Sequence, residues 1–175
     1  MSLKDDGVIW YADANNTVDG FRAYSSLVYF DGAMVLKCPM GNNSPDENKN
    51  KMMFKTETID INARETEWKN AGYTKVQMRV YIPSANLSAE TKARGSKTVL
   101  FGANTDMKNG VKVSVPLDQW YTFEMDIHSY LTTCYNATYN YLAIFGAYNK
   151  ANASADPVEY YDANFDLYFD SIRLA

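Results

Sequence analysis

Apolar and polar residues alternate most regularly in two stretches of the chain, 73–82 and 165–170. Successive side chains of a strand point to opposite faces, so this period predicts strands with one buried face. In the first stretch the predicted core residues are Val76, Met78, Val80 and Ile82, and in the second they are Phe165, Leu167 and Phe169. After Asp170 the inward positions pass to Ile172 and Leu174, which indicates a β-bulge near Ser171.

Weaker patterns of the same kind predict more strands at 8–13, 27–30, 33–37, 52–61, 98–103, 111–115, 117–127 and 141–148. Asp31-Gly32 separates two of them by a tight-turn signal and predicts a hairpin. The stretches 62–72 and 129–140 are expected to be polar connections, and a helical turn is expected only at 89–93. Many short strands with closely spaced turns predict an all-β fold, a two-sheet antiparallel β-sandwich, in a single domain spanning 1–175.

Four local stretches resemble one family of proteins in their order along the chain. They are Asp13 with Gly20-Phe21, Asp31-Gly32 with the following apolar strand, the run from Gly72-Tyr73 to Val80-Tyr81-Ile82, and Leu117 to Ile127 around Trp120. The closing stretch 164–174, with its Asp170 before Ile172-Arg173-Leu174, adds to the likeness. Together they resemble non-catalytic carbohydrate-binding modules of the galactose-binding-domain-like type. Ala12-Asp13 stands where that family more often has Phe-Glu, which is a departure.

The resemblance implies a jelly-roll connectivity and a structural calcium ion. In such modules the ion ties the first strand to the last, and the matching positions here are Asp13, Asp31 and Asp170. Calcium prefers several oxygen ligands, and carboxylates placed close together repel one another unless a cation or a proton lies between them. Ordinary turn and edge aspartates are the alternative explanation.

The composition narrows the range of binding partners that can be expected. The formal net charge is −4 and no basic stripe is present, so nucleic acid is not expected. No apolar run is long enough to insert into a membrane. Aromatic residues make up 14% of the chain, and tyrosine dominates them, which suits either β-strands or a polar recognition surface. Cys38 and Cys134 lack metal-site spacing, and either a disulfide or two free thiols fits the sequence.

Sugars stack their C–H faces on aromatic rings, and their hydroxyls need planar polar partners. The outward faces of 73–82 and 117–127, with the tyrosine-rich segment that follows, offer such groups, and the predicted ligand-binding residues are Gln77, Arg79, Tyr81, Trp120, Glu124, Asp126, His128 and Tyr135. A solvated face on which Arg79 pairs with Glu124 or Asp126 is the alternative. Trp68 is either a further platform or a cover over the sandwich edge.

Catalysis has less support. The chain has one histidine, His128, and no Gly-x-Ser-x-Gly elbow. Glu124 and Asp126 share a predicted strand face, so a glycosidase-like carboxylate pair is conceivable, although outward polar residues explain them equally simply. No catalytic residue is therefore predicted.

The sequence thus predicts a carbohydrate-binding module that holds a polysaccharide, accessory to a glycan-degrading or cell-surface protein of a bacterium. We expect it to be secreted or at the cell surface, to belong to a larger multidomain protein, and to carry a cloning remnant or linker at 1–4. Two alternatives stand beside it. One is a structural or adhesive sandwich without a sugar site, and the other is a jelly-roll polysaccharide lyase or glycoside hydrolase.

Overall fold

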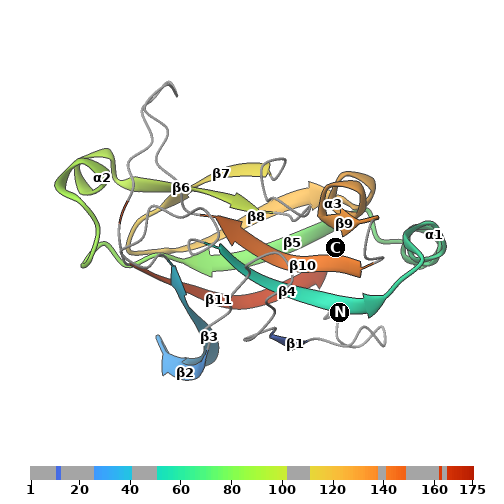
Figure 1. Ribbon diagram of the computed structural model, residues 1–175, viewed down its shortest axis with the longest axis horizontal. Coiled ribbons are helices and arrows are strands. Elements are labelled where there is room, and N and C mark those ends of the chain that lie inside the picture. Colours follow the sequence, from blue (N-terminus) through green and yellow to red (C-terminus); the bar gives the residue numbers. More distant parts are fainter. Residues whose placement is uncertain are drawn as a thin grey trace.

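The protein is an all-β sandwich of two antiparallel sheets (Figure 1). The structure, a computed structural model, describes residues 11–12, 26–40, 51–101, 111–137, 141–148, 162 and 165–175. Within these residues one sheet has five strands in the order β2-β3-β11-β5-β8. The other has six, in the order β1-β4-β10-β6-β7, with β9 pairing β10 beside this path.

The strands of the five-stranded sheet are β2 (Ser26–Phe30), β3 (Ala33–Met40), β11 (Phe165–Leu174), β5 (Lys75–Tyr81) and β8 (Trp120–Asp126). Those of the six-stranded sheet are β1 (Tyr11–Ala12), β4 (Lys51–Thr58), β10 (Tyr141–Tyr148), β6 (Ser96–Phe101), β7 (Val111–Pro116) and β9 (Tyr135–Asn136). The predicted all-β sandwich is therefore confirmed. Several boundaries move by a few residues, because strand ends are set by pairing partners as well as by the chain's own pattern.

The core lies between the sheets and is built from the alternating residues of the most regular strands. On β5 and just after it, the four predicted inward side chains are at most 1% exposed. On β11 all five predicted inward side chains are buried as well. The ladder between β11 and β5 shifts register between Phe169 and Ser171, which confirms the predicted bulge. The shift carries Ile172 and Leu174 back to the core side.

The predicted hairpin at Asp31-Gly32 is also confirmed. Backbone φ is 49° at Asp31 and 83° at Gly32. A two-residue turn with positive φ at both central positions has the handedness that matches the twist of the flanking strands. The hairpin projects from one edge of the sandwich, where β2 and β3 are drawn in blue (Figure 1).

Two helices correct the sequence prediction. Helix α1 (Ile61–Asn70) replaces the expected polar connection, and α3 (Ile127–Cys134) replaces the first half of the expected loop at 129–140. Each begins at an aspartate whose carboxylate accepts backbone N–H groups of the first turn: Asp60 from Asn62 and Ala63, and Asp126 from Ser129. Helix α1 buries only Trp68, so it has no apolar stripe that the sequence could show. Helix α3 does bury a helical stripe, Ile127, Tyr130, Leu131 and Cys134, but its start was interpreted as the end of a strand.

Helix α2 (Ala89–Arg94) agrees with the predicted helical turn. Ser88 caps its start, and Gly95 ends it in the left-handed conformation with φ of 74°. On α1, Trp68 is only 2% exposed and joins the core, so its interpretation as a binding platform is wrong.

Both cysteines are buried free thiols. Cys38 lies on β3 and Cys134 ends α3, and each belongs to the apolar core. Burial raises the pKa of the Cys38 thiol well above its ordinary value. Of the two alternatives left open by the sequence, the structure therefore has the free thiols. None of the described helices is both long and apolar enough to cross a membrane.

Candidate functional site

The predicted binding residues of β5 and β8 lie side by side on the outer face of the five-stranded sheet. In the antiparallel register Gln77 lies opposite Glu124, and Tyr81 lies opposite Trp120. Because their inward neighbours fill the core, these side chains point away from it. The expectation that the two strands are neighbours is confirmed. The outer face runs from an aromatic end to a polar end.

Four rings form the aromatic end, called here the aromatic cluster: Phe30 of β2, Tyr81 of β5, Trp120 of β8 and Tyr168 of β11. Phe30 stacks on Tyr168 with ring centroids 4.0 Å apart and planes 14° apart. Tyr81 meets Trp120 edge to face at 5.5 Å. Burial, together with the carboxylates of Asp118 and Asp31, raises the pKa of Tyr81. Its hydroxyl therefore keeps its proton and can donate a hydrogen bond at neutral pH.

A chain of charged contacts crosses the sheet next to the aromatic cluster. The Arg79 guanidinium carbon lies 4.5 Å from the centroid of the Trp120 ring, a cation–π contact. Arg79 Nη1 also donates to Asp170 Oδ2 at 2.8 Å, and Trp120 Nε1 donates to Asp31 Oδ2 at 2.7 Å. Trp120 is thus held at its face by an arginine and at its edge by a carboxylate, so its orientation is fixed.

The polar end is built around Glu124. Gln77 Nε2 donates to Glu124 Oε1 at 3.3 Å, and Lys75 forms an ion pair with Glu124 Oε2. Lys75 and Gln77 lower the pKa of the Glu124 carboxyl. Arg173 of β11 lies opposite Gln77 in the register and is exposed. This end offers amide, carboxylate and guanidinium groups in one row, the kinds of partner that hydroxyl groups use.

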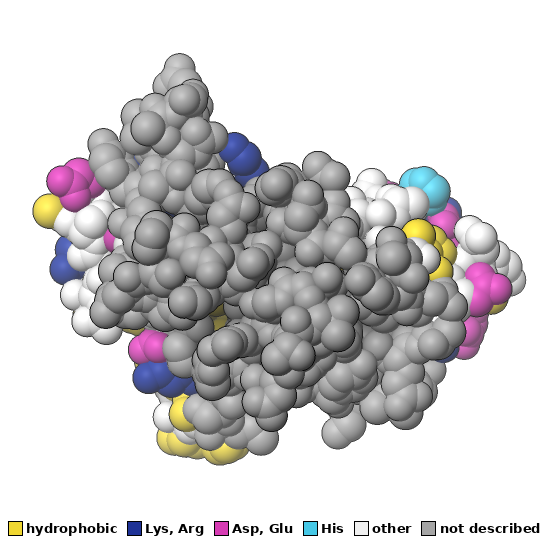
Figure 2. Space-filling view, viewed as in Figure 1, with side chains coloured by type: hydrophobic (Ala, Val, Ile, Leu, Met, Phe, Trp, Pro, Cys, Tyr) yellow, Lys and Arg dark blue, Asp and Glu magenta, His cyan; other side chains and the backbone are white. Residues whose placement is uncertain are grey.

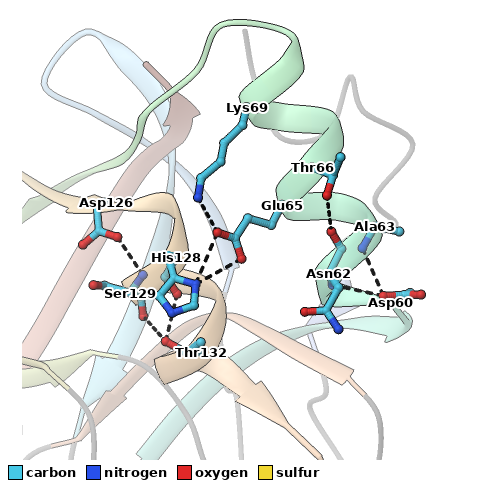
Figure 3. A network of polar contacts seen from close by, with 10 residues as sticks. All are labelled: Asp60, Asn62, Ala63, Glu65, Thr66, Lys69, Asp126, His128, Ser129 and Thr132. Carbon is cyan, nitrogen blue, oxygen red and sulfur yellow. Dashed lines mark hydrogen bonds and ion pairs between the residues drawn. The ribbon is translucent and has the colours of Figure 1, made fainter.

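Two predicted binding residues, His128 and Tyr135, lie elsewhere, so their assignment to this face is corrected, whereas Asp126 is the last residue of β8, opposite Lys75. His128 is not on a strand; it lies in α3, and its Nδ1 is 3.1 Å from Glu65 Oε2 of α1 (Figure 3). Glu65 also pairs with Lys69, and these two partners lower its pKa. Figure 1 shows α1 and α3 at the opposite end of the molecule from the β2–β3 hairpin. The strand pattern failed here because β8 ends at Asp126, where the helix begins.

Asp126 is occupied as the cap of α3, since its Oδ1 accepts the Ser129 N–H at 2.9 Å (Figure 3). Tyr135 belongs to β9 and packs against the core, and its strand pairs β10 of the six-stranded sheet. Tyr130 of the same tyrosine-rich segment is fully buried, and Tyr139 lies outside the described residues.

The capping role of Asp126 gives a simple prediction. Asp126→Ala is expected to lower the free energy of unfolding by about 1 kcal/mol, because the first turn of α3 loses its acceptor. Urea denaturation followed by far-UV circular dichroism measures this loss. Asp126→Ser restores a capping oxygen and should recover most of it; equal losses in both variants would contradict the capping role.

The glycosidase-like pair finds no support in the electrostatics. A general acid needs a carboxyl whose pKa is raised. The pKa of Glu124 is lowered by Lys75 and Gln77, and that of Asp126 by Ser129, so both are carboxylates at neutral pH. As arranged, the pair supplies hydrogen-bond acceptors and no proton donor.

Only two of the three predicted calcium ligands lie within the described residues. Asp31 and Asp170 do come to the same face, but one accepts from Trp120 and the other from Arg79. Asp13 lies outside the described residues, and among those that are described no group of three or more His, Cys, Asp or Glu side chains is placed to hold a metal. Calcium at Asp13, Asp31 and Asp170 remains a prediction of the resemblance.

A buried ion pair was missed by the sequence reasoning. Lys97 Nζ lies 2.7 Å from Asp162 Oδ2, with side chains 4% and 0% exposed. Asp162 Oδ1 also accepts the Ser88 N–H at 2.6 Å, and the Thr91 hydroxyl donates to Oδ2 at 3.1 Å. A signal was present, because Lys97 shares the inward alternation of Val99 and Phe101. These contacts tie α2 to the segment before β11 and serve the fold.

The comparisons with known proteins add no identity: no family model matches the sequence, and no match was found among the curated proteins.

Proposed function

We propose that the protein is a non-catalytic carbohydrate-binding module, and that it holds a polysaccharide on the outer face of the five-stranded sheet. One observation carries this proposal. Aromatic rings and a row of amide, carboxylate and guanidinium groups adjoin on neighbouring strands of one open face. Aromatic faces suit the apolar side of a sugar ring, and the polar row suits its hydroxyls.

The strand order supports the jelly-roll part of the proposal. From β3 to β5 the chain alternates between the five- and six-stranded sheets. The hairpin β6–β7 then lies in the six-stranded sheet, β8 returns to the other, and β10 and β11 lie again in opposite sheets. This repeated crossing is typical of a double-sheet jelly roll. We further propose that such a module serves as an accessory to a glycan-degrading or cell-surface protein outside the bacterial cell.

The charges of the face favour a neutral glycan. Lys37 pairs with Asp166, Arg79 with Asp170, and Lys75 with Glu124. Cations already neutralised by carboxylates attract an acidic polysaccharide weakly, so uncharged chains such as xylan, glucan or mannan are expected to bind in preference to pectin. The retention should change little with salt concentration.

Affinity electrophoresis tests the proposal. The domain is run through native gels that contain xylan, glucan, mannan or pectin, and retardation without degradation is expected in at least one neutral gel. Arg79→Ala should weaken binding about tenfold or more, since a hydrogen bond from a charged group is worth roughly 1.5–3 kcal/mol.

Arg64→Ala is the matched control. Arg64 forms the same kind of ion pair, with Glu67 at 3.0 Å, but on α1. Its loss should leave the retardation unchanged. A folded domain that migrates alike in every gel would overturn the proposal.

A structural or adhesive sandwich is the second candidate, and the same ion pairs favour it. Charges that compensate one another across β3, β11, β5 and β8 also suit a solvated sheet surface with no ligand. Absence of retardation in all gels, with the domain shown to be folded, would favour this candidate.

A further inference from the structure

The tip of the β2–β3 hairpin reaches across the outer face of the five-stranded sheet. In the strand order β3, β11 and β5 lie between β2 and β8. Phe30 of β2 nevertheless stacks on Tyr168 of β11, and Asp31 accepts a hydrogen bond from Trp120 of β8. The hairpin is therefore folded over the aromatic end of the proposed binding face.

Phe30 occupies the position that a bound sugar ring would need. Its ring lies nearly parallel to Tyr168, with centroids 4.0 Å apart, which is the arrangement of a stacked ligand. Tyr81 and Trp120 approach Phe30 with centroids at 5.0 Å and 6.1 Å, each at 67°. Since Arg79 already covers a face of Trp120, stacking of a sugar at this end requires Phe30 to leave.

The hairpin tip is attached to the rest of the sheet by few backbone contacts. The ladder between β3 and β11 ends at Leu36, which pairs with Phe169. From that point the ladder from Val28–Val35 to Phe30–Ala33 pairs β2 only with β3. A two-stranded ribbon is marginally stable by itself, so its position depends on side-chain contacts.

The other face of the ribbon is open. Tyr29 and Met34 are cross-strand partners, and they are 74% and 59% exposed. Figure 2 shows hydrophobic side chains gathered at this end of the molecule, at the lower left. Among the described residues, the tip is held by the aromatic cluster, by the side chain of Val35, which is 1% exposed, and by the exposed hydrogen bond between Asp31 and Trp120. Because this bond is exposed, water competes for both of its partners, and breaking it costs less than breaking a buried one.

We propose that the β2–β3 tip is a lid, and that Phe30 occupies the sugar-stacking position until a polysaccharide displaces it. This inference rests on the proposed function and specifies how its site is regulated. The closed lid reduces the apparent affinity by the fraction of molecules that are open. Removal of the internal occupant should therefore tighten binding.

The experiment compares Phe30→Ala with Tyr29→Ala, which removes an aromatic ring from the opposite, exposed face of the same ribbon. In the gels described above, Phe30→Ala is expected to bind the retained polysaccharide about five- to tenfold more tightly than the unaltered domain. Tyr29→Ala should bind like the unaltered domain, and Tyr168→Ala should lose binding. Thermal unfolding of each variant confirms that it is folded.

Asp31→Asn provides an independent measurement should Phe30→Ala not fold. The hydrogen exchange rate of the Trp120 indole N–H, assigned in ¹H–¹⁵N spectra with Trp120→Phe, should rise in Asp31→Asn because the carboxylate acceptor is weakened. Saturating polysaccharide should shift the same resonance in the unaltered domain, as the tip leaves.

The outcomes separate the two proposals. If the unaltered domain is retarded but Phe30→Ala and Asp31→Asn bind the polysaccharide no more tightly than it does, the lid proposal is wrong and the binding module stands. If neither the unaltered domain nor any variant is retarded, the binding module is wrong, and the lid with it.

Discussion

Asp162→Ala is expected to lower the free energy of unfolding by about 3–5 kcal/mol, the range for breaking a buried ion pair by removal of one partner. The variant leaves the ammonium of Lys97 in the interior, where its side chain is 4% exposed. It also removes the acceptor of the Ser88 N–H and the Thr91 hydroxyl. Urea denaturation followed by far-UV circular dichroism measures the loss. An effect below about 1 kcal/mol would contradict the role assigned to the pair.

The double variant Lys97→Met with Asp162→Leu is the matched control. It removes both charges and keeps apolar volume at the two positions, so it should be far less destabilised than Asp162→Ala. Buried ion pairs replaced by packed apolar residues are often neutral in stability, because the desolvation cost of both ions disappears. A double variant as unstable as the single one would indicate that packing, and not the loss of the carboxylate opposite Lys97, causes the destabilisation.

The same pair predicts an acid sensitivity. Burial opposes ionisation of Asp162, but the contacts with Lys97 and Ser88 outweigh it, so the pKa of the carboxyl is lowered in the folded protein. A lowered pKa contributes stability that is present above the unfolded value of about 4 and is lost as the pH falls through the folded value. The unaltered domain should thus lose stability below about pH 4, and the double variant should lose less over that range.

Trp68→Ala has the second largest expected effect, about 3–5 kcal/mol of unfolding free energy, as for other buried aromatic side chains cut back to alanine. Trp68 is 2% exposed and is the buried residue by which α1 packs on the core. Without it the remaining side chains of α1 are half-buried or exposed, so the helix should detach. Urea denaturation measures the stability, and faster amide hydrogen exchange across 61–70 should report the detachment.

Trp68→Phe distinguishes packing from hydrogen bonding. The Trp68 indole N–H is buried and has no hydrogen-bond partner among the described residues. Phenylalanine keeps an aromatic ring and removes the unpaired donor, so Trp68→Phe should cost much less than Trp68→Ala. Equal losses in the two variants would mean that the Trp68 indole N–H makes a stabilising contact, because phenylalanine keeps most of the packing.

The regular strands were predictable because their cause is local. Burial of one face selects residues such as Val76, Met78 and Val80 at every second position, and the same pattern shows the bulge in β11. The turn at Asp31-Gly32 was predictable for a similar reason, because glycine, with aspartate before it, tolerates positive φ. These features depend on neighbours in sequence.

The predictions that failed concern the helices α1 and α3. Helix α1 has one buried residue, Trp68, so it lacks the apolar stripe by which a helix is recognised. His128 continued the outward alternation of β8, but Asp126 starts a helix there and turns the ring toward Glu65. Capping aspartates are a local signal that distinguishes these cases, since each stands just before the helix it starts.

The candidate site was also predicted only in part. Gln77, Arg79, Tyr81, Trp120 and Glu124 were placed on one face correctly, because the strand period determines the face and the register brings β5 beside β8. The contribution of Phe30 was not predictable, since it depends on how the hairpin bends over the sheet. The alternation of apolar and polar residues predicts which face of a sheet a side chain lies on. It does not predict which other strand bends over that face.

The position of β11 has a consequence for how the protein is made. This strand follows the other four strands of its sheet along the chain, yet it lies between β3 and β5 and pairs with both. Until residues 165–174 have emerged, β3 and β5 expose the edges that they later share with it. The five-stranded sheet is therefore completed only after β11 has been translated, in a step that joins segments distant along the chain. Nascent chains stalled before that point should need protection from aggregation.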